Sequence, residues 1–134
     1  MLSTVWTKVK EGATREPVVV PPQTSLRSAT DVMARHSIGA VVVATDKQVV
    51  GILSERDVVN ALAAGADPDG ATVAGAMSHD VVSLRPDDTI YDAAVDMLDL
   101  GIRHVPVLSE RGAVLGMVSV RDLLRPLLTA SLDR

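Results

Sequence analysis

The chain has 134 residues, of which 47% are hydrophobic and 22% charged, with a formal net charge of −4 and no cysteine. This length fits one ordinary domain or two very small ones that share a core, and the hydrophobic content argues against disorder. The acidic charge and the scarcity of aromatic residues argue against nucleic-acid binding, and the lack of cysteine excludes a disulfide framework and a thiolate metal site. With no signal-like segment and no long apolar span, we expect a cytoplasmic protein.

The first half of the chain predicts a short lead-in helix, a strand, a helix, a hairpin of two strands and a second helix. Prolines bracket the first strand, because proline cannot sit inside a hydrogen-bonded ladder. A run rich in valine is too short for a helix and indicates a buried strand, while Ser25 and Ser54 are placed to cap helices. The expected boundaries are a lead-in helix over 4–10 ended by Gly12, strands over 17–22, 40–44 and 49–53, a tight turn at 46–48, and helices from 26 to 36 and from 54 to a stop at Gly65.

After a linker at residues 67–71 the same order begins again. Thr89 and Asp92 form the sequence signature of a capping box at the start of a helix, and Gly101 is placed to end that helix. We expect Pro126 to kink or end the last helix. The expected boundaries are a lead-in helix over 73–77, strands over 81–84, 104–108 and 114–118, and helices from 90 to 101 and from 119 onward.

The second half repeats the first at an offset of 64 residues, which becomes 65 after one extra residue in the second hairpin. The offset superposes the heptapeptide Gly51–Asp57 on Gly116–Asp122. So many matches at one spacing indicate a duplicated unit. The predicted domains are residues 1–66 as the first repeat with its lead-in, 67–71 as the linker, and 72–134 as the second repeat with a C-terminal tail.

Each copy would be only marginally stable alone, because so little of its surface becomes buried, so we expect the two to pack sheet to sheet around a pseudo-two-fold axis. The fold class is α/β (α+β), and each repeat has the order β-α-β-β-α. A helical crossover places the first strand of each repeat parallel to the second, and the hairpin adds an antiparallel partner. The result is a small mixed sheet in each repeat with helices on its outer side.

The repeated heptapeptide has a structural and a functional interpretation. Ser54 with Asp57, and Ser119 with Asp122, can simply cap helices, and a single Ser-x-x-Asp is more often a cap than a site. The functional interpretation uses the same groups, because helix N-terminal amides attract phosphate and an aspartate can accept both hydroxyls of a ribose. The glycine that opens each heptapeptide would let backbone approach a ligand closely.

The heptapeptides resemble the Gly-hydrophobic-x-Ser/Thr-x-x-Asp motif of cystathionine-β-synthase-type (CBS) domains, which occur in tandem as a Bateman module. Residues 102–107 resemble the second-strand motif of the same family, and the resemblance covers about residues 17–128. It implies a CBS pair, usually a homodimer, that is not an enzyme. It also implies regulatory binding of an adenosine-containing ligand such as AMP, ADP, ATP, NAD or S-adenosylmethionine, and an effector protein whose identity the sequence does not give.

The resemblance also implies which residues form the nucleotide sites. Asp57 and Asp122 would hold ribose hydroxyls, and Ser54 and Ser119 would face the ribose-phosphate. Adenine would lie between first-strand and second-strand residues, and arginine side chains suit phosphate oxygens. The candidate residues are Val82, Ile102, Arg103, His104, Pro106, Ser119, Arg121 and Asp122 in the second repeat, and Val18, Ile38, Ala40, Ser54, Arg56 and Asp57 in the first.

The two candidate sites differ in charge. His104 and Pro106 of the second repeat correspond to Ala40 and Val42 of the first, and Arg103 corresponds to Gly39. We therefore predict that the Asp122 site binds phosphorylated ligands more tightly, and that the Asp57 site is weaker, empty or suited to a less charged ligand.

Other functions remain as alternatives. The main one is a ligand-independent dimerisation or scaffold protein that regulates a partner and in which both Ser-x-x-Asp motifs are only caps. A zinc site is disfavoured because the three histidines are scattered. A hydrolase triad of Ser119, His104 and Asp122 is disfavoured because the sequence has no nucleophile elbow and the aspartate is placed to cap. A DNA-binding regulator is disfavoured by the acidic charge.

Overall fold

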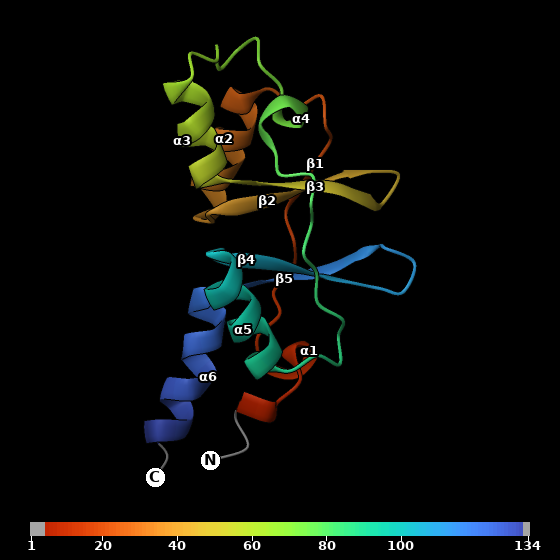
Figure 1. The fold of residues 1–134 in the computed structure, drawn as a ribbon, viewed down its shortest axis with the longest axis vertical. Coiled ribbons are helices and arrows are strands. Elements are labelled where there is room, and N and C mark those ends of the chain that lie inside the picture. The colour runs from red at the N-terminus through yellow and green to blue at the C-terminus, as the bar shows by residue number, and fades with distance from the viewer. Residues whose placement is uncertain (1–4, 133–134) are drawn as a thin grey trace. The chain divides into compact units, whose positions relative to one another are not determined.

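The computed structural model describes residues 5–132, with side chains as far as Leu128 (Figure 1). It contains two compact units. The first-repeat unit comprises Val18–Val81, and the second-repeat unit joins the chain up to Pro17 to the chain from Val82 onward. Within the described residues, no helix is both long enough and apolar enough to cross a membrane.

The first-repeat unit is a three-stranded sheet whose helices lie on one face (Figure 1). The first strand runs parallel to the second, and the second pairs antiparallel with the third, so the predicted order of strands and helices is confirmed. Asp46 and Lys47 form the tight turn between the second and third strands with φ of 51° and 68°. The elements are β1 (Val19–Val20), α2 (Leu26–His36), β2 (Ala40–Thr45), β3 (Gln48–Ser54), α3 (Glu55–Ala63) and α4 (Val73–Ala76).

The core of this unit forms where α2 packs on the sheet. Buried residues recur along α2 at helical spacing, and alternate residues of β2 and β3 point toward them. Ser25 caps α2 as predicted, because its hydroxyl accepts a hydrogen bond from the Ser28 amide at 3.0 Å. The central core residues are Leu26, Ala29, Met33, Val41, Val43 and Leu53.

The second-repeat unit is built around the antiparallel pair of β4 and β5, again with its helices on one face (Figure 1). Thr89 and Asp92 form the predicted capping box, and Gly101 ends the helix in the left-handed conformation at φ 66°. The elements are α1 (Val9–Gly12), α5 (Ile90–Leu100), β4 (His104–Leu108), β5 (Val114–Ser119) and α6 (Val120–Leu132).

The strand expected at residues 81–84 does not form. In the first-repeat unit, the Val42 amide donates to the Val18 carbonyl at 2.9 Å and joins β1 to the sheet. Pro106 stands at the corresponding position of β4 and has no N–H to donate, so the equivalent bond to Val82 is lost. Only an isolated parallel bridge between Leu84 and Val107 remains.

Two helix boundaries also differ from expectation. The lead-in helix spans Val9–Gly12 rather than 4–10 (residue 4 lies outside the described residues), because residues 7 and 8 pair with the segment that precedes α5. The last helix continues through Pro126 to Leu132. Proline fixes φ near the helical value, so within α6 it removes one hydrogen-bond donor without ending the helix.

Each lead-in segment packs in the unit of the other repeat. In the second-repeat unit, the Val9 amide donates to the Asp88 carbonyl at 2.8 Å, and the Ile90 amide donates to the Thr7 carbonyl at 2.9 Å. The first-repeat unit has the same two bonds, from Val73 to Thr24 at 2.8 Å and from Leu26 to Ala71 at 3.0 Å. The compact units therefore follow different boundaries from the linear repeats.

Candidate functional site

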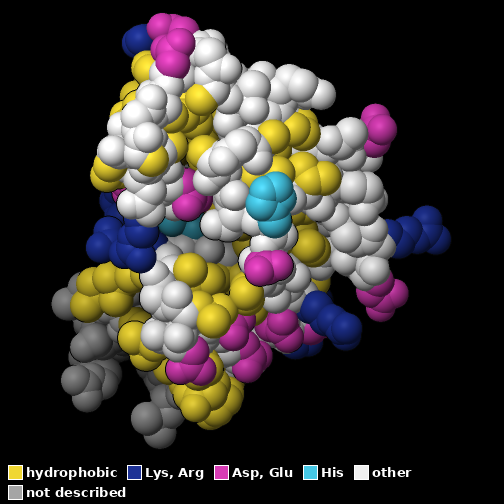
Figure 2. Space-filling model, turned by 45° about the horizontal axis from the view of Figure 1, so that its top comes forward, with side chains coloured by type: hydrophobic (Ala, Val, Ile, Leu, Met, Phe, Trp, Pro, Cys, Tyr) yellow, Lys and Arg dark blue, Asp and Glu magenta, His cyan; other side chains and the backbone are white. Residues whose placement is uncertain are grey.

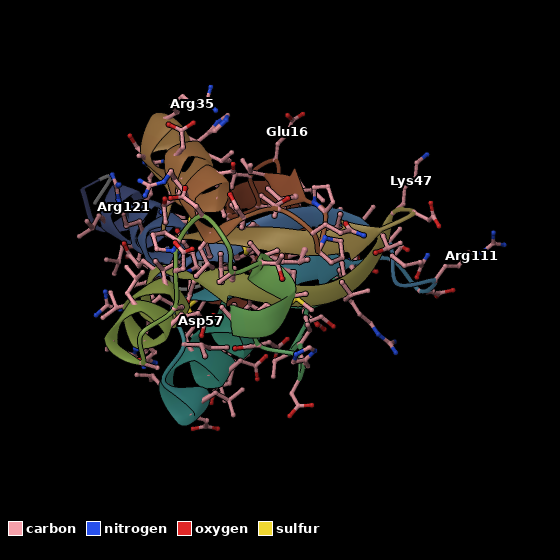
Figure 3. All side chains as sticks on the ribbon, turned by 90° about the horizontal axis from the view of Figure 1, so that it is seen from above. Glu16, Arg35, Lys47, Asp57, Arg111 and Arg121 are labelled. Carbon is pink, nitrogen blue, oxygen red and sulfur yellow. The ribbon has the colours of Figure 1, made fainter. Side chains whose placement is uncertain are left out.

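In both units the hairpin's last strand passes directly into a helix at the motif serine. Ser54 ends β3 in extended backbone conformation and α3 begins at the next residue. The Asp57 amide donates to Ser54 Oγ at 3.2 Å, and the Ser54 amide donates to Asp57 Oδ2 at 2.9 Å. This reciprocal capping box shows that the motif caps α3, and it fixes the position of the Asp57 carboxylate at the start of that helix (Figure 3).

The same bonds form at the start of α6. The Asp122 amide donates to Ser119 Oγ at 3.2 Å, and the Ser119 amide donates to Asp122 Oδ2 at 2.9 Å. The Ser119 hydroxyl also donates to Oδ2 at 2.9 Å. Asp122 is buried, with 6% of its surface exposed, whereas Asp57 is only partly buried.

The start of the second strand in each repeat lies beside the motif. Ala40 pairs with Ser54 across β2 and β3, and His104 pairs with Ser119 across β4 and β5. The first amide of the helix after the motif donates to the backbone carbonyl of the residue that precedes the second strand. The Glu55 amide of α3 donates to the Gly39 carbonyl at 2.9 Å, and the Val120 amide of α6 donates to the Arg103 carbonyl at 3.0 Å. The backbone thus brings the predicted second-strand and motif positions together within each unit.

The remaining candidate residues fall into two groups. The apolar ones are buried or pack against the core of their own unit. The arginines are exposed, and Figure 3 shows Arg121 projecting from α6. The apolar group is Val18, Ile38, Ala40, Val82, Ile102 and Pro106, and the exposed group is Arg56, Arg103 and Arg121.

Asp122 also forms an ion pair with a residue that lies outside the sequence motif. Arg15, from the lead-in segment, donates to Asp122 Oδ1 through Nε at 3.1 Å and through Nη2 at 2.6 Å. Both oxygens of Asp122 are therefore engaged. Among the described residues, Asp57 has no ion pair, and its Oδ1 has no hydrogen-bond partner.

Arg15 reaches Asp122 because its backbone is paired with β5. Arg15 and Met117 exchange both backbone hydrogen bonds, at 3.1 and 3.0 Å. In the first-repeat unit, Ser78 and Ile52 exchange the same two bonds at 2.9 and 3.1 Å. We call residues 12–15 and 75–78 the straps. Ser78 therefore occupies the strap position of the first-repeat unit that Arg15 occupies in the other.

The motif glycines accommodate these straps. A Cβ added to Gly51 would lie 2.5 Å from Met77 Sδ and 2.9 Å from the Ser78 carbonyl oxygen. A Cβ added to Gly116 would lie 3.0 Å from the Arg15 carbonyl oxygen and would overlap the Thr14 side chain. The backbone that approaches each motif glycine closely is thus a strap of the chain itself.

A cavity of about 230 Å³ opens beside the Arg15–Asp122 pair. It is formed entirely within the second-repeat unit and contains two guanidinium groups and one carboxylate. Among the described residues, Arg125 makes no ion pair, so the cavity carries an excess of positive charge. Its lining residues are Gly12, Ala13, Thr14, Arg15, Asp122 and Arg125.

One sequence signal could have pointed to Arg15. The dipeptide Gly12-Ala13 returns as Gly75-Ala76, an offset of 63 residues, which aligns Arg15 with Ser78. This dipeptide repeat lies outside the heptapeptide motif. It points to Arg15 only once it is known that each lead-in segment packs in the unit of the other repeat.

The arrangement offers little support for the other chemistries. Ser119 Oγ accepts from the Asp122 amide, as a helix cap does, and donates its own proton to the Asp122 carboxylate, so it is not positioned as a nucleophile activated by a histidine. No three metal-ligating side chains come together among the described residues. On the face drawn in Figure 2, acidic side chains gather in the lower part and the basic ones are dispersed, which is unlike the basic stripe of a DNA-binding surface.

Comparison with known protein families finds the same domain in each of the two repeats. The family model for the CBS domain matches residues 9–64 and again residues 73–129. An uncharacterised 17.7 kDa protein of Acidianus ambivalens is 40% identical over 123 residues, which cover 91% of this chain and 74% of the relative.

Solved structures share the fold. A CBS domain protein from Pyrobaculum aerophilum, complexed with AMP, has a TM-score of 0.83 and 28% identity, with 94% of this chain and 99% of that chain covered. A CBS domain pair in complex with 5′-methylthioadenosine and S-adenosyl-L-methionine has a TM-score of 0.84 and 25% identity, with 93% and 98% covered.

Proposed function

The chain belongs to the CBS domain family and carries two copies of that domain, and from this premise we propose that it is a non-catalytic regulatory protein that binds adenosine-containing ligands. The proposed role is to sense adenine nucleotides and hence the energy state of the cell. A bound ligand would favour one of two conformations, to the extent that its affinities for them differ, and a partner protein would respond to that change.

The single observation that carries this proposal is the free carboxylate oxygen of Asp57. One oxygen of this residue is fixed by the Ser54 amide, while Oδ1 has no partner among the described residues. A carboxylate oxygen held rigidly at the start of a helix can accept hydrogen bonds from ribose hydroxyls. The capping carboxylate of Asp92 also keeps one oxygen without a partner among the described residues, so what sets Asp57 apart is its position in the repeated motif, beside the start of β2.

The ligands of the related structures support an adenosine-containing class. AMP, 5′-methylthioadenosine and S-adenosyl-L-methionine differ in their 5′ groups and share the adenosine moiety. For this chain we propose the sites expected above, with Ser54 and Asp57 in the first-repeat unit and Ser119 and Asp122 in the second at the ribose. The remaining proposed contacts are Val18, Ile38, Ala40 and Arg56 in the first site, and Val82, Ile102, Arg103, His104, Pro106 and Arg121 in the second.

We also propose that the protein is a homodimer. Large apolar side chains are exposed on the helices of both units, among them Leu98 at 84% and Val59 at 63% exposed. Apolar surface of this kind is stabilised when a second copy covers it. Sedimentation equilibrium should give twice the chain mass, and a purely monomeric distribution would contradict the dimer.

A thermal-shift panel of adenosine, AMP, ADP, ATP, NAD and S-adenosylmethionine tests the function. A ligand at 100 times its Kd stabilises the folded state by about 2.7 kcal/mol, which is easily measured as a rise in Tm. Mass spectrometry of small molecules that co-purify with the native protein then identifies the ligand. The alternative, a ligand-independent scaffold, predicts no shift with any compound of the panel and no co-purifying nucleotide.

A further inference from the structure

The carboxylate of Asp122 has no acceptor position left for a ribose. An ionised carboxylate offers about four lone-pair sites. In the structure, the Ser119 amide and hydroxyl donate to Oδ2, and two guanidinium nitrogens of Arg15 donate to Oδ1. The contacts of Ser119 belong to the cap of α6, so a ligand that needs Asp122 must displace Arg15.

Displacing Arg15 with a neutral nucleoside is unfavourable. Ribose hydroxyls would replace the hydrogen bonds to Asp122, but they would leave this buried carboxylate without the cation that compensates its charge. The guanidinium would also lose its anionic partner. A nucleoside without phosphate therefore competes poorly with Arg15.

A phosphate group on the ligand changes this balance. Phosphate oxygens accept the paired donors of a guanidinium as well as a carboxylate does. The cavity beside Asp122 contains Arg15 and also Arg125, which makes no ion pair among the described residues. A phosphorylated ligand can thus give Arg15 a new anionic partner inside the same cavity while its ribose takes the place of Arg15 at Asp122.

We propose that Arg15 makes the Asp122 site selective for nucleosides that carry a phosphate group, by occupying Oδ1 of Asp122 until a phosphate takes over its guanidinium. This inference rests on the proposed function and adds to it a selectivity that the motif residues do not supply. The Asp57 site has no such guanidinium, because Ser78 takes the place of Arg15 on its strap and Oδ1 of Asp57 has no partner among the described residues. The Asp57 site therefore accepts nucleosides with or without phosphate.

The test isolates the Asp122 site in the variant Asp57→Asn and titrates it with adenosine and with AMP by calorimetry. We expect AMP to bind and adenosine to bind at least about tenfold more weakly. Adding Arg15→Ser, which installs the strap residue of the other unit, should raise adenosine affinity by about tenfold or more and reduce the preference for AMP. Arg27→Ser is the matched control, because Arg27 forms an exposed pair with Asp69 in the first-repeat unit.

Two results overturn the proposal. Either adenosine affinity is the same with and without Arg15→Ser, or AMP fails to bind to Asp57→Asn while it binds to the wild-type chain. In both cases, binding of adenosine compounds to the wild-type chain would leave the proposed function standing. Absence of any binding to the wild-type chain would instead overturn the proposed function, and this inference with it.

A second measurement follows ligand binding in the wild-type chain and uses a variant only to assign one resonance. The Arg15 Nε–H resonance of the wild-type chain, assigned by its loss in Arg15→Gln, should shift when AMP is added because the guanidinium changes partner. Adenosine should leave it in place. A resonance that AMP does not move at saturation would overturn the proposal.

Discussion

Arg15 and Ser78 occupy the same position in their two units, since each exchanges both backbone hydrogen bonds with the residue that follows the motif glycine. Their side chains differ in reach and charge, and only Arg15 contacts the motif aspartate. The two repeats share this backbone geometry but differ at the motif carboxylate. Both oxygens of Asp122 are hydrogen-bonded, whereas Oδ1 of Asp57 has no partner among the described residues.

Removing the Arg15 side chain should destabilise the ligand-free protein. In Arg15→Ser the buried Asp122 carboxylate keeps its two bonds from Ser119 and loses its cation. Because Arg15 itself is 41% exposed, we expect a loss of about 1–2 kcal/mol rather than the larger cost of breaking a fully buried pair. Urea denaturation measures the loss. An unchanged midpoint would mean that the pair contributes nothing to folding.

Replacing a motif glycine should displace a strap. In Gly51→Ala the new methyl group would lie 2.9 Å from the Ser78 carbonyl oxygen, which is backbone and cannot swing aside as a side chain can. We expect a destabilisation of about 1–3 kcal/mol, measured by urea denaturation. Gly75→Ala is the control, because nothing lies within 4 Å of its added Cβ. Equal stabilities for the two variants would contradict the close approach of the strap.

The chain contains a built-in control for the capping interpretation. Thr89 and Asp92 form a capping box with the same geometry as that of Ser54 and Asp57, but at a helix start outside the heptapeptide motif. Thr89→Ala and Ser54→Ala should each cost about 1 kcal/mol of stability. Only Ser54→Ala should also reduce the thermal shift given by adenosine. If both variants reduce that shift equally, Ser54 has no role beyond capping.

Asp96 should make the folded state less stable as the pH rises. Burial raises the pKa of the Asp96 carboxyl above its usual 3.8, and the charges of Asp88, Asp92 and Asp99 raise it further. The folded state therefore holds this proton more tightly than the unfolded state, so the contribution of Asp96 to stability falls as the pH rises from about 3.8 through its folded pKa. Asp96→Asn should raise Tm at pH 7 and lose this advantage below pH 3.8, as calorimetry at several pH values would reveal. A variant less stable than wild type at pH 7 would contradict this assignment.

Pro126 should weaken α6. It lies inside the helix and supplies no backbone N–H, so one hydrogen bond of the helix is missing. Pro126→Ala should stabilise the protein by about 1–3 kcal/mol if the backbone there is otherwise helical. Thermal unfolding tests this, and a loss of stability would show that the ring contributes packing that outweighs the missing bond.

Local signals predicted local structure well. The caps at Ser25, Ser54 and Thr89 depend on residues three positions apart, so the sequence carries all the information they need. The strand expected at 81–84 failed because its partner residue, Pro106, lies some twenty residues further along the chain and withholds the required N–H. That effect appears only when the two segments are paired.

The motif residues of the candidate site could be predicted from the sequence, but the ion pair that engages Asp122 could not. Ser119 and Asp122 are visible in the sequence because they repeat. The Gly-Ala repeat aligns Arg15 with Ser78, but it does not reveal the role of Arg15, because that role depends on the lead-in segment joining the unit of the other repeat. The expectation that the Asp122 site is the stronger of the two now depends on whether the ligand carries a phosphate that can release Arg15.

The central claim, that a motif aspartate binds the ribose of an adenosine-containing ligand, is tested most directly by calorimetric titration of adenosine into the wild-type chain and into the variants Asp57→Asn and Asp92→Asn. Asp92 is the matched control, because it is a capping aspartate outside the motif. The account predicts one adenosine site in the wild-type chain and in Asp92→Asn, and a loss of that site in Asp57→Asn. Equal adenosine affinity in all three chains would contradict it.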